Sequence, residues 1–130
     1  MFLKPFLCRM SNELKNRTKI FVLKVIQFVR KMPFSDINYI MGKQLFRSAT
    51  STGANYRSAL RGKSTADFIA KLSIAEEEAD ETCYWLELLI ESGIDDVKGA
   101  EEILIEARQI AAILTASGKT AKSKINIKDR

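Results

Sequence analysis

Seven consecutive small residues occupy positions 48–54, inside a pattern whose apolar spacing is helical on both sides. Threonine and glycine destabilise a helix by roughly 0.5 to 1 kcal/mol per residue relative to alanine, so tertiary packing has to offset them. Small side chains let a neighbouring helix approach closely. The segment therefore predicts a tight helix contact, with Ser48, Ala49, Thr52 and Gly53 as candidate packing or interface residues.

Four stretches of helical spacing follow one another along the chain, at about residues 12–32, 35–61, 64–91 and 95–117. The first helix can be capped by Ser11 or Asn12 and stops before Pro33, and the second can be capped by Ser35 or Asp36 and ends at Gly62. The third is capped by Ser64 and ends at Gly93, and the fourth can be capped by Asp95 or Asp96 and ends near Gly118. Short loops place consecutive helices antiparallel. The sequence predicts an all-α fold, an up-down-up-down antiparallel four-helix bundle.

A chain of 130 residues is long enough for one domain with its own core. We expect a bundle domain over residues 12–122, preceded by a disordered extension of residues 1–11 and followed by a basic tail of residues 123–130. The first helix carries a second apolar stripe at Ile20, Leu23, Ile26 and Val29, which one core does not need. This stripe predicts a partner surface and thus an oligomer.

The residue types that most enzymes and metal sites use are scarce. The chain has no histidine, and its two cysteines, Cys8 and Cys83, are far apart. The tripeptide at positions 62–64 is Gly-Lys-Ser, but a phosphate loop also needs glycine at position 57, which is Arg57. We therefore expect a protein that is not an enzyme and holds no cofactor or metal.

The cysteines and the hydropathy also bear on location. Cys83 lies on an apolar stripe and is interpreted as a small buried hydrophobic residue. Unpaired cysteines fit a reducing cytoplasm. No run approaches the 18 or so apolar residues of a membrane span, so we expect a cytoplasmic protein without a membrane partner.

The net charge of +5 hides a segregation of charge along the chain. Residues 1–35 carry 8 basic residues and 1 acidic residue, whereas residues 64–92 carry 1 basic and 8 acidic residues. An antiparallel turn at Gly62 places Lys43 and Arg47 opposite the acids of residues 77–81. It leaves Arg57 and Arg61 with only Asp67 nearby, so these two arginines should remain without an acidic partner.

In an up-down-up-down bundle, the start of the chain, the turn near Gly62 and the end of the chain lie at one pole. A basic pole is typical of sequence-independent phosphate binding, although a solvated end without a ligand remains possible. Only Tyr56 offers an aromatic ring beside these cations, which is weak support for base stacking. The candidate nucleic-acid-binding residues are Lys15, Arg17, Lys19, Arg57, Arg61, Lys63, Lys119, Lys122 and Lys124.

Tyr84 and Trp85 lie off the main apolar stripe of the third predicted helix and are interpreted as packing or interface residues. The same helix carries the acids Glu76, Asp80, Glu87 and Glu91 on one face. That face suggests a second hypothesis, a protein-protein adaptor that docks a basic partner and has no nucleic-acid role. Binding to random RNA or DNA would distinguish the two hypotheses.

Two blocks of the sequence resemble a known family. They are Arg-Ser-Ala-Thr-Ser-x-Gly-Ala-Asn at residues 47–55 and Ala-Asp-Phe followed by Glu-Glu-Glu-Ala-Asp-Glu at residues 66–81. Over residues 12–122 the chain resembles the bacterial four helix bundle proteins, also called the 23S rRNA intervening-sequence protein family. Many relatives continue the first block with an acid and a glycine, where this chain has Arg57, Ser58 and Ala59.

The resemblance implies properties that the residues alone do not. Members of the family form homopentameric rings, and a related accessory protein of diversity-generating retroelements binds nucleic acid and a reverse transcriptase. In such a ring the basic poles would align into one face. We expect a non-enzymatic homo-oligomer, a pentamer by resemblance, that contacts RNA or DNA through its basic pole.

Overall fold

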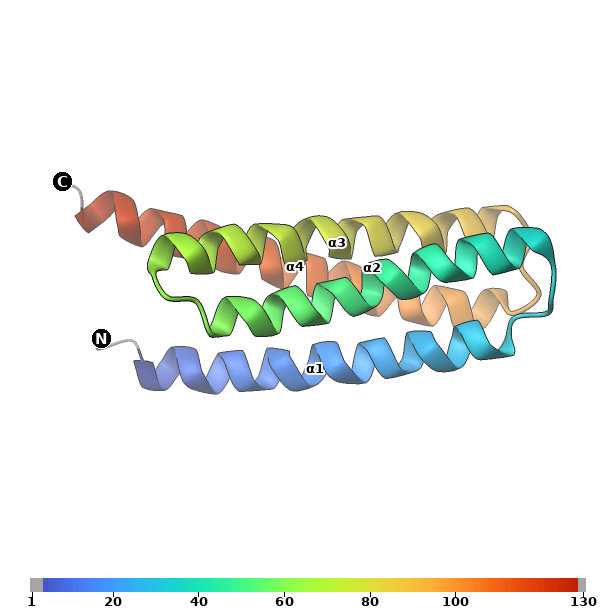
Figure 1. The fold of residues 1–130 in the computed structure, drawn as a ribbon, viewed down its shortest axis with the longest axis horizontal. Coiled ribbons are helices and arrows are strands. Elements are labelled where there is room, and N and C mark those ends of the chain that lie inside the picture. Colours follow the sequence, from blue (N-terminus) through green and yellow to red (C-terminus); the bar gives the residue numbers. More distant parts are fainter. Residues whose placement is uncertain (1–3, 129–130) are drawn as a thin grey trace.

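The computed structural model describes the backbone of residues 4–128 and the side chains of residues 12–124. Within this part, four helices follow one another: α1 at Lys4–Lys31, α2 at Asp36–Leu60, α3 at Thr65–Glu91 and α4 at Val97–Lys128. They alternate in direction along one long axis (Figure 1), which confirms the predicted four-helix bundle.

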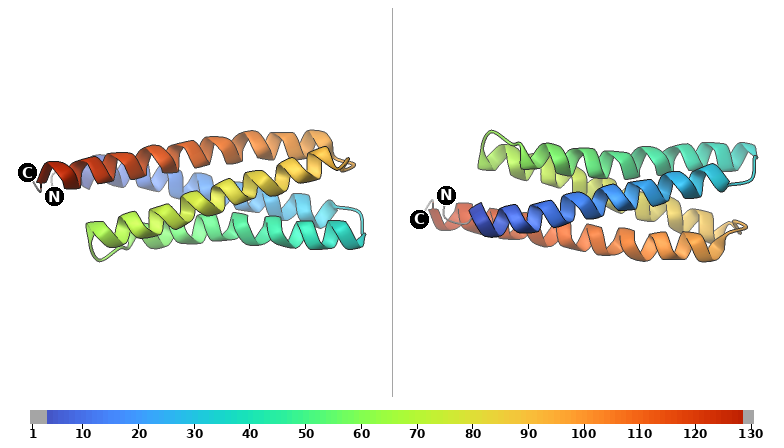
Figure 2. Two further views of the ribbon diagram at one scale, coloured as in Figure 1. Left: turned by 90° about the horizontal axis from the view of Figure 1, so that it is seen from above. Right: turned by 90° about the horizontal axis from the view of Figure 1, so that it is seen from below.

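Each helix touches two neighbours, because contacts join α1 to α2, α2 to α3, α3 to α4, and α4 back to α1. The views from above and below show the same order around the bundle (Figure 2). The start of α1, the α2–α3 turn and the end of α4 lie at one end, and the other two turns lie at the opposite end (Figure 1). The topology therefore brings together the segments that the sequence assigned to one pole.

The turns contain the predicted caps. The hydroxyl of Ser35 accepts a hydrogen bond from the Asn38 N–H, and that of Ser64 accepts one from the Asp67 N–H, each at 3.0 Å. At the end of α3, the Gly93 N–H donates to the Ile90 carbonyl at 3.2 Å, and the Ile94 N–H donates to the Leu89 carbonyl at 3.1 Å. This pair of bonds needs the left-handed φ of +88° that Gly93 adopts.

Gly62 ends α2 for a different reason, because its φ is not left-handed. A Cβ at this position would lie 3.0 Å from the Ala59 carbonyl oxygen and 3.1 Å from the Phe68 nitrogen. Both atoms belong to the backbone and cannot move aside easily. The turn therefore needs glycine because the ends of α2 and α3 approach each other closely.

Two helices are longer than predicted. The helix α1 begins at Lys4 rather than at Ser11 or Asn12, so the backbone from Lys4 onward is helical where a disordered extension was expected. Pro5 is compatible with this start because the first helical turn has no intrahelical acceptors for its N–H groups. Residues 1–3 lie outside the described part, and the division into one bundle domain and two tails stays a prediction.

The helix α4 continues through Gly118 to Lys128, although Gly118 was predicted to end it near residue 117. Gly118 keeps a negative φ, and no proline follows, so nothing interrupts the backbone hydrogen bonds. The predicted basic tail is therefore helical through Lys128, and residues 129–130 lie outside the described part.

Small residues of α2 fill the centre of the bundle. Ser48, Ala49 and Thr52 are fully buried, and the Thr82 hydroxyl on α3 lies 2.9 Å from the Ser48 hydroxyl. The described side chains leave no buried polar atom without a partner. These hydroxyls satisfy one another and nearby carbonyls, so polar residues can occupy a helix contact that is too close for larger apolar ones.

The contact between α1 and α2 depends on two glycines. A Cβ at Gly42 would lie 3.3 Å from Val29, and a Cβ at Gly53 would lie 3.4 Å from Val22. Gly42 is buried and belongs to the close contact, although the sequence pattern did not single it out. The two positions fix how α1 and α2 lie against each other.

Substitutions in this contact should separate overpacking from helix propensity. Ala49→Leu should destabilise the fold by about 1 to 3 kcal/mol, because Ala49 has no exposed surface. Gly53→Leu should also destabilise it, since a longer side chain has to displace Val22. Gly53→Ala should be neutral or stabilising by up to about 1 kcal/mol, because its Cβ would make an ordinary contact. Urea unfolding measures all three, and an unchanged midpoint for Ala49→Leu would contradict the close packing.

Candidate nucleic-acid interface

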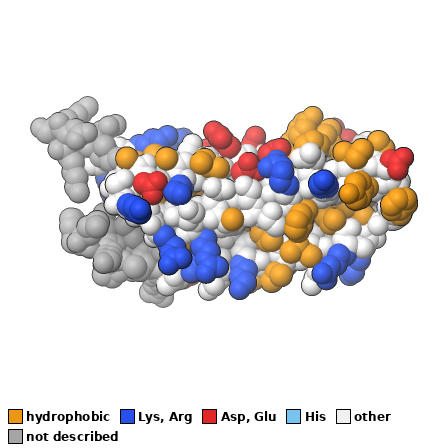
Figure 3. Space-filling model, viewed as in Figure 1, with side chains coloured by type: hydrophobic (Ala, Val, Ile, Leu, Met, Phe, Trp, Pro, Cys, Tyr) orange, Lys and Arg blue, Asp and Glu red, His pale blue; other side chains and the backbone are white. Residues whose placement is uncertain are grey.

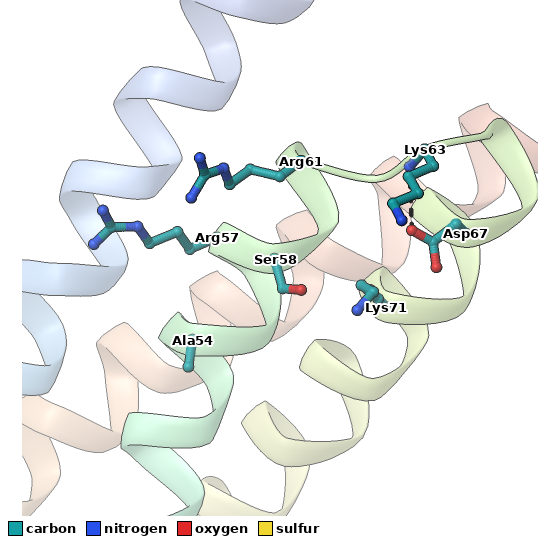
Figure 4. Close-up of a pocket in the computed structure, with 7 residues that line it drawn as sticks. All are labelled: Ala54, Arg57, Ser58, Arg61, Lys63, Asp67 and Lys71. Atoms are coloured by element: carbon teal, nitrogen blue, oxygen red, sulfur yellow. Dashed lines mark hydrogen bonds between the residues drawn. The ribbon is translucent and has the colours of Figure 1, made fainter.

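Two arginines in the last turns of α2 form the centre of the candidate interface. Arg57 and Arg61 are exposed, and both side chains extend from α2 toward α1 (Figure 4). They are four residues apart, which is about 6 Å along a helix. Among the described residues, no carboxylate lies within 4.0 Å of either guanidinium.

Two lysines of α1 lie on the stripe of that helix which contacts α2. Gly53 contacts Val22, and Lys19 and Lys15 precede Val22 by three and seven residues, so these three residues share one stripe of α1. Arg57 and Arg61 follow Gly53 by four and eight residues on the matching stripe of α2. Both lysines are exposed and, within the described part, neither has a carboxylate within 4.0 Å.

We call the four residues Lys15, Lys19, Arg57 and Arg61 the basic quartet. Because α1 and α2 are antiparallel, the residues that follow Gly53 on α2 run alongside the residues that precede Val22 on α1. Lys and Arg side chains are seen over α1 and α2 near the end that holds the α2–α3 turn (Figure 3). The quartet is therefore a set of exposed cations carried by two neighbouring helices.

An open hollow of about 350 Å³ lies between the end of α2 and the start of α3, and both arginines belong to its lining. It is lined by Ala54, Arg57, Ser58, Arg61, Lys63, Asp67 and Lys71. Asp67 accepts a hydrogen bond from the Lys63 backbone N–H at 3.2 Å (Figure 4). Lys71 was not among the predicted residues, although it is the one basic residue in positions 64–92 and lies one helical turn after Asp67.

Arg17 differs from the other cations of this pole because it forms an ion pair. Its Nε and Nη2 atoms donate to the two carboxylate oxygens of Glu106 on α4, at 3.0 and 2.6 Å, and Nη2 also donates to Gln109. The hydrogen bond to Arg17 lowers the pKa of Glu106. Arg17 is thus largely neutralised, and the sequence pattern had not identified Glu106 as its partner.

The three lysines near the end of α4 lie apart from the quartet. Lys119, Lys122 and Lys124 are exposed, and the neighbouring Gly118 faces Leu72 of α3. This contact places them beside the beginning of α3. The pole is therefore divided into the basic quartet on α1 and α2 and a separate group of lysines on α4.

The predicted hairpin pairing is present at Arg47. Its guanidinium binds Glu78 at 3.1 Å and Glu81 at 2.5 Å on α3. The hydrogen bond from Arg47 lowers the pKa of Glu81 and stabilises its charged form. For Lys43, by contrast, no described carboxylate lies within 4.0 Å.

The aromatic and sulfur groups near these elements face inward. Tyr56 is only 5% exposed, and burial raises its pKa to about 12. Cys83 is buried as predicted, and burial raises the pKa of its thiol to about 11, so the thiol stays protonated near neutral pH. The side chain of Cys8 lies outside the described residues.

The remaining interface candidates lie near the opposite end. Trp85 packs against the core, donates to Glu81 at 3.3 Å and makes an edge contact with Tyr84, with 5.4 Å between ring centroids. Tyr84 itself is exposed.

Hydrophobic side chains gather toward the end that holds the α1–α2 turn (Figure 3). The most exposed large ones there are Phe34, Ile37, Tyr39 and Ile40, which we call the apolar end.

Within the described residues, no three His, Cys, Asp or Glu side chains are placed to hold a metal ion. No helix in this part of the chain is long and apolar enough to cross a membrane.

The Arg17–Glu106 pair gives stability a dependence on pH. The pKa of Glu106 is lowered from 4.5, so its contribution is present above that value and is lost as the pH falls through the lowered pKa. Arg17→Gln should reduce the unfolding free energy at pH 7 by about 0.2 to 1 kcal/mol, as for partly exposed pairs. Urea unfolding should show this difference shrinking as the pH falls below 4.5, and a difference that stays constant down to the lowest pH at which the protein folds would contradict it.

Comparisons with known proteins complete the description. Residues 10–116 match the model of the family described as 23S rRNA-intervening sequence protein. A solved structure of a protein with unknown function from the S23 ribosomal protein family of Bacteroides thetaiotaomicron is 37% identical, with a TM-score of 0.77. The match covers 84% of this chain and 97% of that chain. No curated protein shows a significant match. The chain therefore belongs to the 23S rRNA-intervening sequence protein family, as the sequence blocks predicted.

Proposed function

We propose that the protein is a non-enzymatic, homo-oligomeric, cytoplasmic binding module that contacts the phosphate backbone of RNA or DNA through the basic quartet. The observation that carries this proposal is four exposed cations on two adjacent helices with no described carboxylate within 4.0 Å. Unpaired lysines and arginines gathered on one surface attract phosphates and release their counterions.

The distribution of the acids supports the same function. Glu78 and Glu81 pair with Arg47, Glu106 pairs with Arg17, and Glu87 pairs with Arg108 at 3.2 Å. These acids thus neutralise other cations, and none of the ion pairs among the described residues involves the quartet. The family description refers to 23S rRNA, and the similar Bacteroides protein is assigned to the S23 ribosomal protein family, which favours RNA as one ligand.

The adaptor hypothesis has less support, because several acids of α3 already bind partners within the chain. Glu78, Glu81 and Glu87 are in ion pairs, and Glu76 accepts a hydrogen bond from Thr115 at 2.7 Å. On the predicted acidic face itself, the ion pair with Arg108 neutralises Glu87, and the Thr115 hydroxyl occupies one oxygen of Glu76.

Two separate apolar surfaces support self-association. Phe34 is 91% exposed at the apolar end, and Ile20 and Leu23 are about half exposed on the outer side of α1. Fully burying one such side chain stabilises an assembly by about 1.5 to 3 kcal/mol. Two different surfaces on one chain can pair head to tail, and such contacts close into a ring when the rotation permits. The pentamer remains the state proposed from the resemblance.

Removing charge from the quartet should weaken nucleic-acid binding. Arg57→Gln with Arg61→Gln should reduce affinity for any sequence, and the salt slope should fall by about 0.7 to 0.9 for each phosphate that the variant no longer binds. The matched control is Arg30→Gln with Lys31→Gln, which removes the same charge from the opposite end of α1. Fluorescence anisotropy with a labelled RNA or DNA measures both variants.

The same assay should separate the quartet from the cations that face α3. Lys43→Gln with Arg47→Gln should mainly lower stability or disturb assembly, because Arg47 pairs with Glu78 and Glu81. An equal weakening of binding by both double substitutions, in folded variants, would contradict the assignment. Absence of wild-type binding at about 50 mM salt, where phosphate contacts are strong, would favour the adaptor hypothesis.

Sedimentation equilibrium tests self-association. The wild type should sediment as an oligomer, with a mass near five times 14.7 kDa if the ring is a pentamer. Ile40→Ser with Phe34→Ser should shift it toward the monomer without unfolding it, because both side chains are exposed in the single chain. Ile105→Ser is a matched control, since Ile40 and Ile105 are each 56% exposed. A folded wild-type monomer at micromolar concentration would contradict the proposal.

A further inference from the structure

The basic quartet has no exposed aromatic neighbour among the described side chains. Tyr56, which precedes Arg57, is turned into the core, and Phe68 at the start of α3 is partly buried against it. Phe46 is exposed, but it lies eleven residues before Arg57, about 16 Å along α2. Tyr84 is exposed 17 residues after Asp67, about 25 Å along α3. Among the side chains of residues 12–124, bases near the quartet would therefore find no ring on which to stack.

This arrangement differs from that of proteins which hold single strands. Those proteins combine a cationic groove with aromatic platforms, and stacking contributes about 1 to 3 kcal/mol per base. In this protein, the sequence placed Tyr56 beside Arg57, but the fold buries its ring. What remains on the surface is charge.

The charge is arranged in two rows. Arg57 and Arg61 are one helical turn apart on α2, and Lys15 and Lys19 are one turn apart on α1. Neighbouring helix axes lie about 8 to 10 Å apart. A duplex presents its phosphates in two rows on the sides of a groove about 6 to 12 Å wide. Long, exposed lysine and arginine side chains on two helices can reach both rows.

We infer that the basic quartet binds the paired phosphate rows of a double-stranded nucleic acid, RNA or DNA, and makes no stacking contact with bases. This inference rests on the proposed function and names its ligand class. Shape and charge density select the ligand, and base sequence has no part in it.

Counterion release gives the size of the preference. The salt slope is about 0.9 per phosphate contact for duplex DNA and about 0.7 for a single strand. For four contacts without stacking, the ratio of duplex affinity to single-strand affinity should be about tenfold larger at 50 mM salt than at 1 M salt. The preference should shrink steadily as salt is added.

The test is a competition assay with the full chain and a labelled DNA duplex of about 24 base pairs. The competitors are unlabelled DNA and RNA duplexes of that length, and oligo(dT) and oligo(U) of about 48 nucleotides, so that phosphate numbers match. Each duplex should displace the label about tenfold more effectively than either single strand at 50 mM salt. Arg57→Gln with Arg61→Gln should reduce the duplex slope by about 1.8, and Arg30→Gln with Lys31→Gln should leave that slope unchanged.

A second measurement reports base contact directly. A single strand that carries 2-aminopurine should keep its emission when the protein binds, because no ring stacks on the base. A change in emission, or single strands that compete as well as duplexes, would overturn this inference while the proposed function stands. If neither duplexes nor single strands bind at 50 mM salt, both this inference and the proposed function are wrong.

Discussion

The close contact that α2 makes with α1 and α3 is the constraint on which the remaining structure depends. Gly42 and Gly53 let α1 approach, and Ser48 hydrogen-bonds to Thr82 of α3 inside the bundle. Because interiors are densely packed, such a contact permits only one register between the helices. That register runs the end of α2, with Arg57, alongside the first half of the described part of α1. The packing residues thus determine where the exposed charges lie.

Ion pairing then decides which cations remain available. Arg47 and Arg57 are on the same helix, but Arg47 faces two carboxylates of α3 and Arg57 extends toward α1 (Figure 4). Arg17 and Lys15 are two residues apart on α1, but only Arg17 faces Glu106. Residue type therefore does not assign a role in this bundle. The face on which a cation lies, and the charge opposite it, assign the role.

The exposed surface has two chemically different ends. The apolar end holds large side chains with nothing to bury them in a single chain, whereas the other end holds four exposed cations that form no ion pair among the described residues. Self-association would bury the apolar end of each chain and would repeat the cationic end around the symmetry axis. Several weak phosphate contacts would then act together, because linked sites raise the effective concentration of one another. Assembly and nucleic-acid binding are thus parts of one proposal.

The sequence by itself determined the four helices, most of their caps and the Arg47 pairing, because these depend on apolar spacing and on one short turn. It did not determine the start of α1 or the end of α4, where no residue stops the helix. The Arg17–Glu106 pair joins residues 89 positions apart, so its register depends on every turn between them. The inward direction of Tyr56 and the place of Lys71 beside the hollow were likewise decided by tertiary structure. Local patterns specify helices, but only packing specifies which faces of different helices meet.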